Sequence, residues 1–142
     1  MKAYVHQGTT ASVSDVTEPQ VGAGQVKIRL KTAGLNRRDL KAPKGRSGDD
    51  PAVILGSDGA GVVEELGSGV TNVQAGDEVI VNPSLGWEAN SPALPDGFDV
   101  LGIPDDGTFA EKLCVAAEQV EIKPAHLSWE EAGVLGPVAV SF

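Results

Sequence analysis

Two short stretches of the sequence hold polar side chains that could take part in chemistry at a site. The first is "AGLNRRD" at residues 33–39, and the second is "LGSDGAGVV", which begins at residue 55. The Asn36 amide could donate a hydrogen bond to a substrate carbonyl, although Asn is also a common turn residue after a strand. The Asp58 carboxylate could orient neighbouring groups, although a carboxylate in a glycine-rich turn often only accepts backbone N–H bonds. The residues alone leave both alternatives open.

Alternating hydrophobicity predicts that β-strands carry these two stretches. Residues 25–32, "QVKIRLKT", alternate aliphatic side chains with Lys27, Arg29 and Lys31, which predicts a strand with one solvent-exposed face. Similar runs lie near residues 4, 62, 80, 112 and 121, with turn signals between them. The eighteen glycines suit tight corners and bulges. We therefore predict a mainly β fold, a partly open antiparallel barrel with few short helices.

Two segments depart from this strand pattern. Residues 83–107 hold four of the nine prolines and show almost no periodicity, which predicts a long loop that leaves the barrel. Near the end of the sequence, Ser128 precedes Glu131 by three residues, the spacing of a capping box. This spacing predicts a helix that starts at residue 128 and runs toward Phe142 with an apolar face.

Composition narrows the classes of function. The 142 residues suffice for one domain with a real core, and no apolar run approaches the ~20 residues of a membrane helix. The formal net charge of −9 argues against a nucleic-acid partner, although eight of the eleven basic residues lie within residues 27–46. Cys114 is the only cysteine and is expected to be a sheet or core residue. His6 and His126 have no ligand partners at metal spacing, so structural roles are expected for both.

Four motifs in this order resemble one known family. The motifs are "AGLNRRDL", "LGSDGAGVVEELGSGVTNVQAGDEVIV", "GTFAEKLCV" and "LSWEEAGVLG". Together they resemble the N-terminal, GroES-like catalytic domain of the medium-chain dehydrogenase/reductase superfamily, and the resemblance covers essentially the whole chain. It implies that residues 1–127 form the GroES-like catalytic domain. Residues 128–142 would begin the helix that leads to a Rossmann domain, whose glycine-rich nucleotide turn the sequence lacks.

The resemblance also bears on metal binding. Zinc alcohol dehydrogenases carry a Cys where this sequence has Asn36, and a His-Glu pair where it has Ser57 and Asp58. Zinc takes thiolate, imidazole or carboxylate ligands, so only Asp58 remains as a suitable donor. The loop at 83–107, in the place of the structural-zinc lobe, contains no cysteine. The sequence therefore resembles the zinc-independent quinone oxidoreductase and enoyl reductase branch, and we expect no metal site.

This branch implies NADP, or NAD, as the cofactor, whose reduced form transfers hydride to an acceptor that is already electrophilic, such as a quinone or an enone. The resemblance makes Asn36 and Asp58 the catalytic candidates and Arg37 and Arg38 the cofactor-binding candidates, because an Arg at the place of Arg37 often touches the cofactor pyrophosphate in zinc members. Ser57 and Trp87 are candidates for the substrate pocket, although Trp87 could instead only anchor the long loop.

Further expectations concern the whole protein and the 142-residue chain by itself. It is expected to be a cytoplasmic homo-oligomer without a membrane partner, and the 142-residue chain alone is expected to be inactive. The alternatives are a zinc-type alcohol dehydrogenase fragment and a non-enzymatic GroES-like binding module. A solvated basic loop is the alternative explanation for the basic residues after Asn36.

Overall fold

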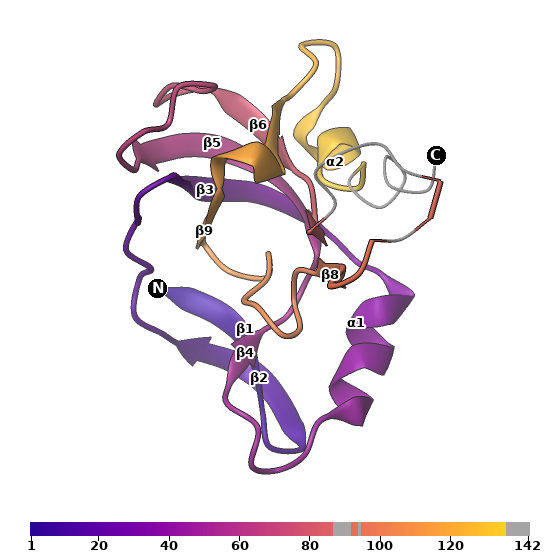
Figure 1. Cartoon of the computed structure of the whole chain (residues 1–142). Helices are drawn as coiled ribbons and strands as arrows, with labels where there is room; N and C mark the ends of the chain where they lie inside the picture. The colour runs from indigo at the N-terminus through magenta and orange to yellow at the C-terminus, as the bar shows by residue number, and fades with distance from the viewer. Residues whose placement is uncertain (87–91, 94, 136–142) are drawn as a thin grey trace.

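A five-stranded antiparallel sheet forms the centre of the molecule (Figure 1). The computed structural model describes residues 1–86, 92–93 and 95–135. The strand order in this sheet is β10-β6-β5-β3-β9. The strands are β3 (Gln25–Gly34), β5 (Asp58–Leu66), β6 (Glu78–Val81), β9 (Lys112–Ala116) and β10 (Val120–Ile122). The strands expected near residues 62, 80, 112 and 121 are confirmed.

A smaller sheet lies beside the first one and holds the N-terminus. Its strand order is β2-β1-β4, with β1 (Lys2–Gln7), β2 (Thr10–Asp15) and β4 (Val53–Ile54). The Tyr4 amide donates to the Phe109 carbonyl, and Ala3 forms an isolated bridge with Ala110, so β1 is tied to the segment that leads into β9. The two open sheets confirm the predicted mainly β fold with few short helices.

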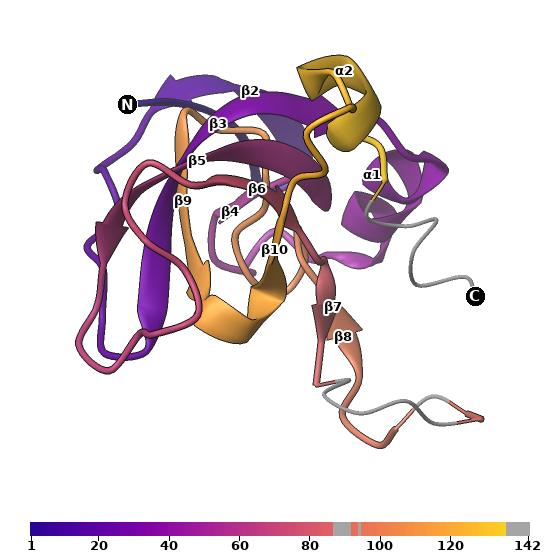
Figure 2. The same cartoon turned by 90° about the horizontal axis from the view of Figure 1, so that it is seen from above.

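The loop predicted at residues 83–107 is partly regular. It contains a two-stranded ribbon of β7 (Ser84–Leu85) and β8 (Asp99–Val100), which projects from the body of the domain (Figure 2). Neither strand was predicted, because two-residue strands are too short to show periodicity. Trp87 lies outside the described residues.

Aliphatic side chains from the five-stranded sheet make the core. Val26 and Ile28 on β3 and Val79 on β6 are fully buried. The remaining members of the cluster are Val63, Val73, Val81, Leu101, Leu113, Val115, Ala117 and Val120. Glycine allows the central strands to approach closely, because a Cβ at Gly61 would lie 2.3 Å from the Arg29 carbonyl oxygen.

The predicted exposed face of β3 is wrong at Lys27. The pairing of β3 with β5 shifts register between Lys27 and Ile28, so three consecutive residues from Val26 are buried and the alternation is lost. The Lys27 side chain is 6% exposed, and its ammonium pairs with Glu18 at 3.2 Å and Glu65 at 2.9 Å. A sequence pattern of period two cannot show such a bulge. The other two basic residues of the pattern are exposed as predicted.

Four short helices complete the described chain. They are α1 (Arg37–Lys41), η1 (Ala42–Gly45), η2 (Ala117–Gln119) and α2 (Trp129–Ala132). The segment after Asn36 is thus helical rather than a loop. The Asp39 carboxylate accepts the Asn36 main-chain N–H at 2.7 Å and caps the first turn of α1.

The capping box at Ser128 is confirmed, but the predicted helix does not continue through residues 133–135, and the rest of its predicted length, 136–142, lies outside the described residues. The Glu131 amide donates to Ser128 Oγ at 3.1 Å, and the Ser128 amide donates to the Glu131 carboxylate at 2.9 Å. The helix ends at Ala132, where Thr32 Oγ1 of β3 donates to the Trp129 carbonyl at 2.7 Å. This tertiary contact fixes the last turn against the sheet, and residues 133–135 leave the helix.

Candidate active site

The site lies where β3 ends beside the start of β5. These strands are antiparallel neighbours, and Gly34 near the end of β3 stands opposite Asp58 at the beginning of β5. Asn36 follows Gly34 by two residues and precedes α1, while Ser57 precedes β5. Residues more than twenty positions apart in the sequence therefore meet at one point. Gly34 makes this possible, because a Cβ there would lie 2.8 Å from the Gly133 carbonyl oxygen and 3.1 Å from Asp58 Cβ.

Hydrogen bonds join the three polar side chains that the sequence singled out. Asn36 Nδ2 donates to Asp58 Oδ2 at 2.6 Å. The same nitrogen lies 3.5 Å from Ser57 Oγ, at the outer limit of a hydrogen bond. Since an amide nitrogen carries two hydrogens, the short bond to Asp58 leaves one N–H with at most a weak partner. Asp58 therefore orients the Asn36 amide.

Burial dominates the electrostatics of Asp58. Its side chain is among the fully buried ones, and removal from water raises the pKa of the carboxyl from 3.8 to about 6. The hydrogen bond from Asn36 opposes this rise in the pKa, and the nearby Asp39 charge adds to it. Asp58 Oδ1 is buried without a hydrogen-bond partner among the described residues. The group thus titrates near neutral pH.

A cleft of about 670 Å³ opens on Asn36. The β1–β2 hairpin forms one wall, and α1 with η1 forms the other; Figure 1 shows these elements facing one another. Phe109 and Leu55 contribute apolar surface, and Arg37 also lines the cleft. Ser57 does not line it and is 3% exposed. The predicted pocket role of Ser57 remains a prediction, as does that of Trp87.

The two candidate arginines have different surroundings. The Arg38 guanidinium donates to the carbonyls of Val100, Leu101 and Ile103 at 3.3, 3.4 and 2.9 Å, and so ties α1 to the segment after β8. Arg37 is exposed on the cleft wall, and no residue that the structure describes pairs with it. Arg37 is therefore the better placed of the two for an external anion, and both cofactor roles remain predictions.

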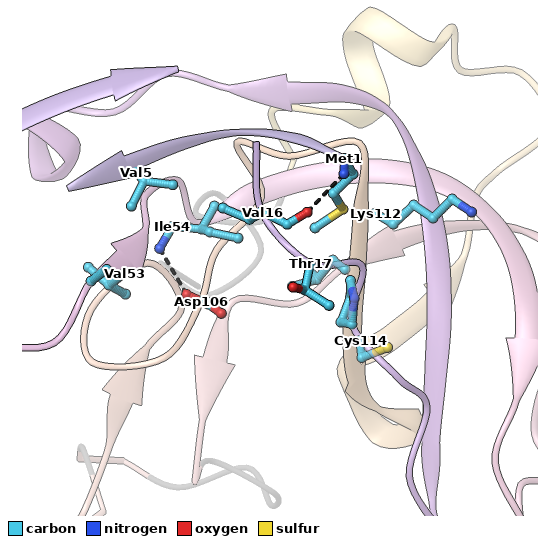
Figure 3. A pocket seen from close by; sticks show the side chains of 12 residues that line it. Met1, Val5, Val16, Thr17, Val53, Ile54, Asp106, Lys112 and Cys114 are labelled. Atoms are coloured by element: carbon cyan, nitrogen blue, oxygen red, sulfur yellow. Dashed lines mark hydrogen bonds between the residues drawn. The ribbon is translucent and has the colours of Figure 1, made fainter. Parts of the chain in front are cut away.

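A second cavity, of about 200 Å³, is lined by residues of β1, β4 and β9 (Figure 3). Its polar groups are already bonded: the Met1 amine donates to the Val16 carbonyl at 2.8 Å, and Asp106 Oδ1 accepts the Ile54 amide at 2.8 Å. Cys114 lines it as a half-buried sheet residue, and burial raises the pKa of its thiol, which disfavours the reactive thiolate. This cavity lacks the features of a reaction site.

The donors at the site do not match those that zinc takes. Asn36, Ser57 and Asp58 offer one amide, one hydroxyl and one carboxylate, whereas catalytic zinc is held by three His, Cys or carboxylate ligands. Nowhere in residues 1–86, 92–93 and 95–135 do three His, Cys, Asp or Glu side chains gather in a way that could hold a metal ion.

Comparison with known proteins matches residues 22–125 to the alcohol dehydrogenase GroES-like domain. The chain belongs to this family. It is thus a domain of the medium-chain dehydrogenase/reductase superfamily, as the resemblance implied. A solved NAD-dependent alcohol dehydrogenase is similar over 94% of this chain and 42% of its own, with 35% identity and a TM-score of 0.83. The quinone oxidoreductase of Coxiella burnetii is similar over 99% of this chain and 43% of its own, with 26% identity and a TM-score of 0.75.

Curated relatives of this GroES-like domain have several activities in their names. A zinc-type alcohol dehydrogenase-like protein of Schizosaccharomyces pombe is 33% identical over 127 residues, which cover 86% of this chain and 36% of that protein. An alcohol dehydrogenase of Geobacillus stearothermophilus is 33% identical over 84% of this chain and 38% of its own length. A crotonyl-CoA reductase of Streptomyces collinus is 31% identical over 89% of this chain and 34% of its own length. The chain thus spans only about a third of the length of each of these three relatives. No helix of the described residues is long and apolar enough to cross a membrane.

Lys44 and Arg46, in the basic segment that the resemblance places at a cleft, line the cleft that opens on Asn36. Sequence reasoning missed Tyr4 and gave His6 only a structural role, although both line the cleft from β1. No local motif marks them, because the wall from the N-terminal hairpin meets the helical wall only in the folded domain. The sequence shows the cluster of basic residues at 27–46. It does not show that Lys27 forms buried ion pairs whereas Arg37, Lys44 and Arg46 line the cleft.

Proposed function

We propose that this chain is the catalytic domain of an NAD(P)H-dependent oxidoreductase that reduces a quinone or an enone-type carbonyl without zinc. The observation that carries the proposal is the bond of 2.6 Å between Asn36, which lines the cleft, and the buried Asp58. By resemblance, zinc members place metal ligands at these positions. Here the same positions hold a hydrogen-bonded amide and carboxylate, which suit a substrate oxygen better than a metal.

The chemistry follows from the second N–H of the Asn36 amide. A bound nicotinamide would supply the hydride. When a quinone or an enone accepts hydride, negative charge develops on its oxygen, and a preorganised N–H donor stabilises that charge. The bond to Asp58 fixes the Asn36 amide and the cap of α1 fixes its main chain, so little reorganisation is needed when a substrate oxygen binds beside it. A simple ketone or aldehyde would need stronger polarisation than one amide provides.

Asp58 acts as a positioning residue in this proposal. It is fully buried and does not line the cleft, so it contacts the substrate only through Asn36. The ionised carboxylate accepts the Asn36 N–H more strongly than the protonated acid. Because the pKa of Asp58 is about 6, the orientation of Asn36 should weaken as the pH falls below that value.

The rest of the proposal concerns the cofactor and the domain boundary. Arg37 would pair with the cofactor pyrophosphate, since its planar guanidinium can bind phosphate oxygens bidentately. Residues 1–127 would form the catalytic domain, and residues 128–142 would lead into a nucleotide-binding domain. The names of the crotonyl-CoA reductase and quinone oxidoreductase relatives support the acceptor class. The similarity to zinc-type and other alcohol dehydrogenases makes zinc-dependent alcohol oxidation the second candidate.

One experiment separates these candidates. The full-length protein is assayed for NADPH and NADH oxidation with a quinone and an enone, and for NAD(P)+ reduction with secondary alcohols, before and after chelator treatment. We expect reduction of the electrophilic acceptors, unaffected by chelator. Alcohol oxidation that is lost with chelator and restored by zinc would establish the second candidate, and no turnover with any acceptor would favour a binding module.

A pair of variants then tests the role of Asn36. Removal of one oxyanion donor typically lowers kcat by ~10²–10³, so Asn36→Ala should lower kcat by about that factor with a small change in KM. Lys41→Ala is the matched control, because Lys41 ends the same helix, is exposed and does not line the cleft. Equal activity of Asn36→Ala and Lys41→Ala would remove Asn36 from the mechanism.

A further inference from the structure

The cleft beside Asn36 is basic although the chain is acidic. Arg37, Lys44 and Arg46 line it, against a single acid, Asp39, in a chain whose net charge is −9. The Asp39 carboxylate is already engaged by the main-chain N–H of Asn36. A cleft with one sign of charge and low-dielectric walls concentrates ligands of the opposite sign.

Two side chains that line the cleft each have a buried nitrogen without a hydrogen-bond partner among the described residues. His6 is 6% exposed and lines the cleft, and its Nδ1 has no hydrogen-bond partner among the described residues. Arg46 donates one terminal N–H to the Pro51 carbonyl, but its Nε, which is always a donor, is buried and unpaired in the same part of the chain. Buried polar groups without partners are costly, so a shift of either side chain toward a ligand in the cleft would gain a hydrogen bond.

Lys44 lies away from the reacting end of the cleft. Lys44 follows Asn36 by eight residues across α1 and η1. At a rise of about 1.5 Å per residue in α1 and about 2.0 Å in η1, the two residues are separated by roughly 13 Å along the helical wall. Leu40 and Pro43 on this wall, and Tyr4 and Phe109 opposite, make the surface between them apolar.

We propose that the natural substrate is amphipathic, with the reducible carbonyl at Asn36, an apolar middle, and a phosphate or carboxylate held by Lys44, Arg46 and His6. This inference rests on the proposed function for the position of the carbonyl. It adds a substrate class and an anion subsite made of residues that take no part in hydride transfer. Arg37 is adjacent to Asn36 and, in the proposed function, pairs with the cofactor pyrophosphate rather than with the substrate.

Binding of simple probes to the full-length protein tests the subsite without turnover. The probes are hexyl phosphate, hexanoate, 1-hexanol and inorganic phosphate, measured by calorimetry at low ionic strength, where surface charges act most strongly. We expect at least one of the two anionic hexyl probes to bind about tenfold or more tightly than 1-hexanol, the lower end of the range for a charged hydrogen bond. The tighter of the two identifies the anion. Inorganic phosphate alone should bind more weakly than hexyl phosphate, because it leaves the apolar surface uncovered.

Variants test whether Lys44 and Arg46 cause the preference for the anionic probe. Lys44→Gln should lower the affinity for the anionic probe about tenfold and leave that for 1-hexanol unchanged, and Arg46→Gln should act in the same direction. Lys44 is exposed and no described residue pairs with it, so this variant should fold normally. Lys41→Gln, exposed on the same segment but outside the cleft, should change nothing.

Three results would overturn the anion subsite. The first is equal affinity for charged and uncharged hexyl probes. The second is a loss of affinity for the anionic probe in Lys41→Gln as large as that in Lys44→Gln. The third is displacement of hexyl phosphate by NADP+ but not by NAD+, which would assign these cations to the cofactor phosphate. Reduction of neutral enones without an anion preference would remove only this inference. An anion preference without reduction of any acceptor would instead remove the proposed function.

Discussion

Replacement of Asp58 by Asn tests whether burial raises the pKa of this carboxyl. The Asn side chain is nearly isosteric and keeps an oxygen that can accept the Asn36 N–H, but it carries no charge at any pH. In the wild-type protein, burial raises the pKa of Asp58 from 3.8 to about 6. The folded state therefore binds this proton more tightly than the unfolded state, and ionisation of Asp58 destabilises the fold.

The size of this destabilisation follows from the difference between the pKa values of Asp58 in the folded and unfolded states. A gap of about two pH units, at 1.36 kcal/mol per unit, corresponds to about 3 kcal/mol of destabilisation once Asp58 is fully ionised. The wild-type protein recovers this free energy as the pH falls through about 6 toward 4. Between pH 8 and pH 5 the recovery amounts to about 1.4 kcal/mol. A pH of 5 also stays above the sequence pI of about 4.5, where solubility is lowest.

The assay is urea unfolding of residues 1–142, wild type and Asp58→Asn, at pH 8 and pH 5. The unfolding free energy of the variant minus that of the wild type should decrease by about 1.4 kcal/mol as the pH is lowered. This difference cancels the groups that titrate identically in both proteins. Asp49→Asn, which removes an exposed carboxylate, is the matched control and should show no such change. A pH-independent difference for Asp58→Asn would refute the assignment of a raised pKa to this buried group.

Three further outcomes are expected. Arg37→Ala in the full-length protein should weaken NAD(P)H binding by roughly 1.5–3 kcal/mol, the range for a charged hydrogen bond, with exposed Lys41→Ala near zero; an unchanged dissociation constant would leave Arg37 as surface charge. Lys27→Ala should lower the unfolding midpoint because it removes a buried ammonium that pairs with two glutamates, whereas exposed Lys31→Ala should not; equal midpoints would mean that the ion pairs do not stabilise the fold. Elemental analysis of the purified protein should find no stoichiometric zinc, and about one zinc per chain that survives dialysis against chelator would contradict the proposal.

Local patterns determined much of the fold. Alternation of apolar and polar residues predicted the strands of the five-stranded sheet, and the spacing of Ser128 and Glu131 predicted the start of α2. Both signals are local, because side-chain direction and capping depend on neighbours within a few residues. The residue types at Asn36, Ser57 and Asp58 were likewise readable, and they indicated which donors the site could offer.

Only the tertiary structure decided how these residues act. The register of β3 against β5 brings Asn36 to Asp58 at 2.6 Å, and the burial that results moves the Asp58 pKa toward 6. The bulge at Lys27 and the contact of Thr32 with the Trp129 carbonyl of α2 also depend on partners distant in the sequence. The basic cleft exists only where the N-terminal hairpin faces α1 and η1. Hydrogen-bond geometry, desolvation and cleft shape are properties of such long-range pairings, so no local pattern could have predicted them.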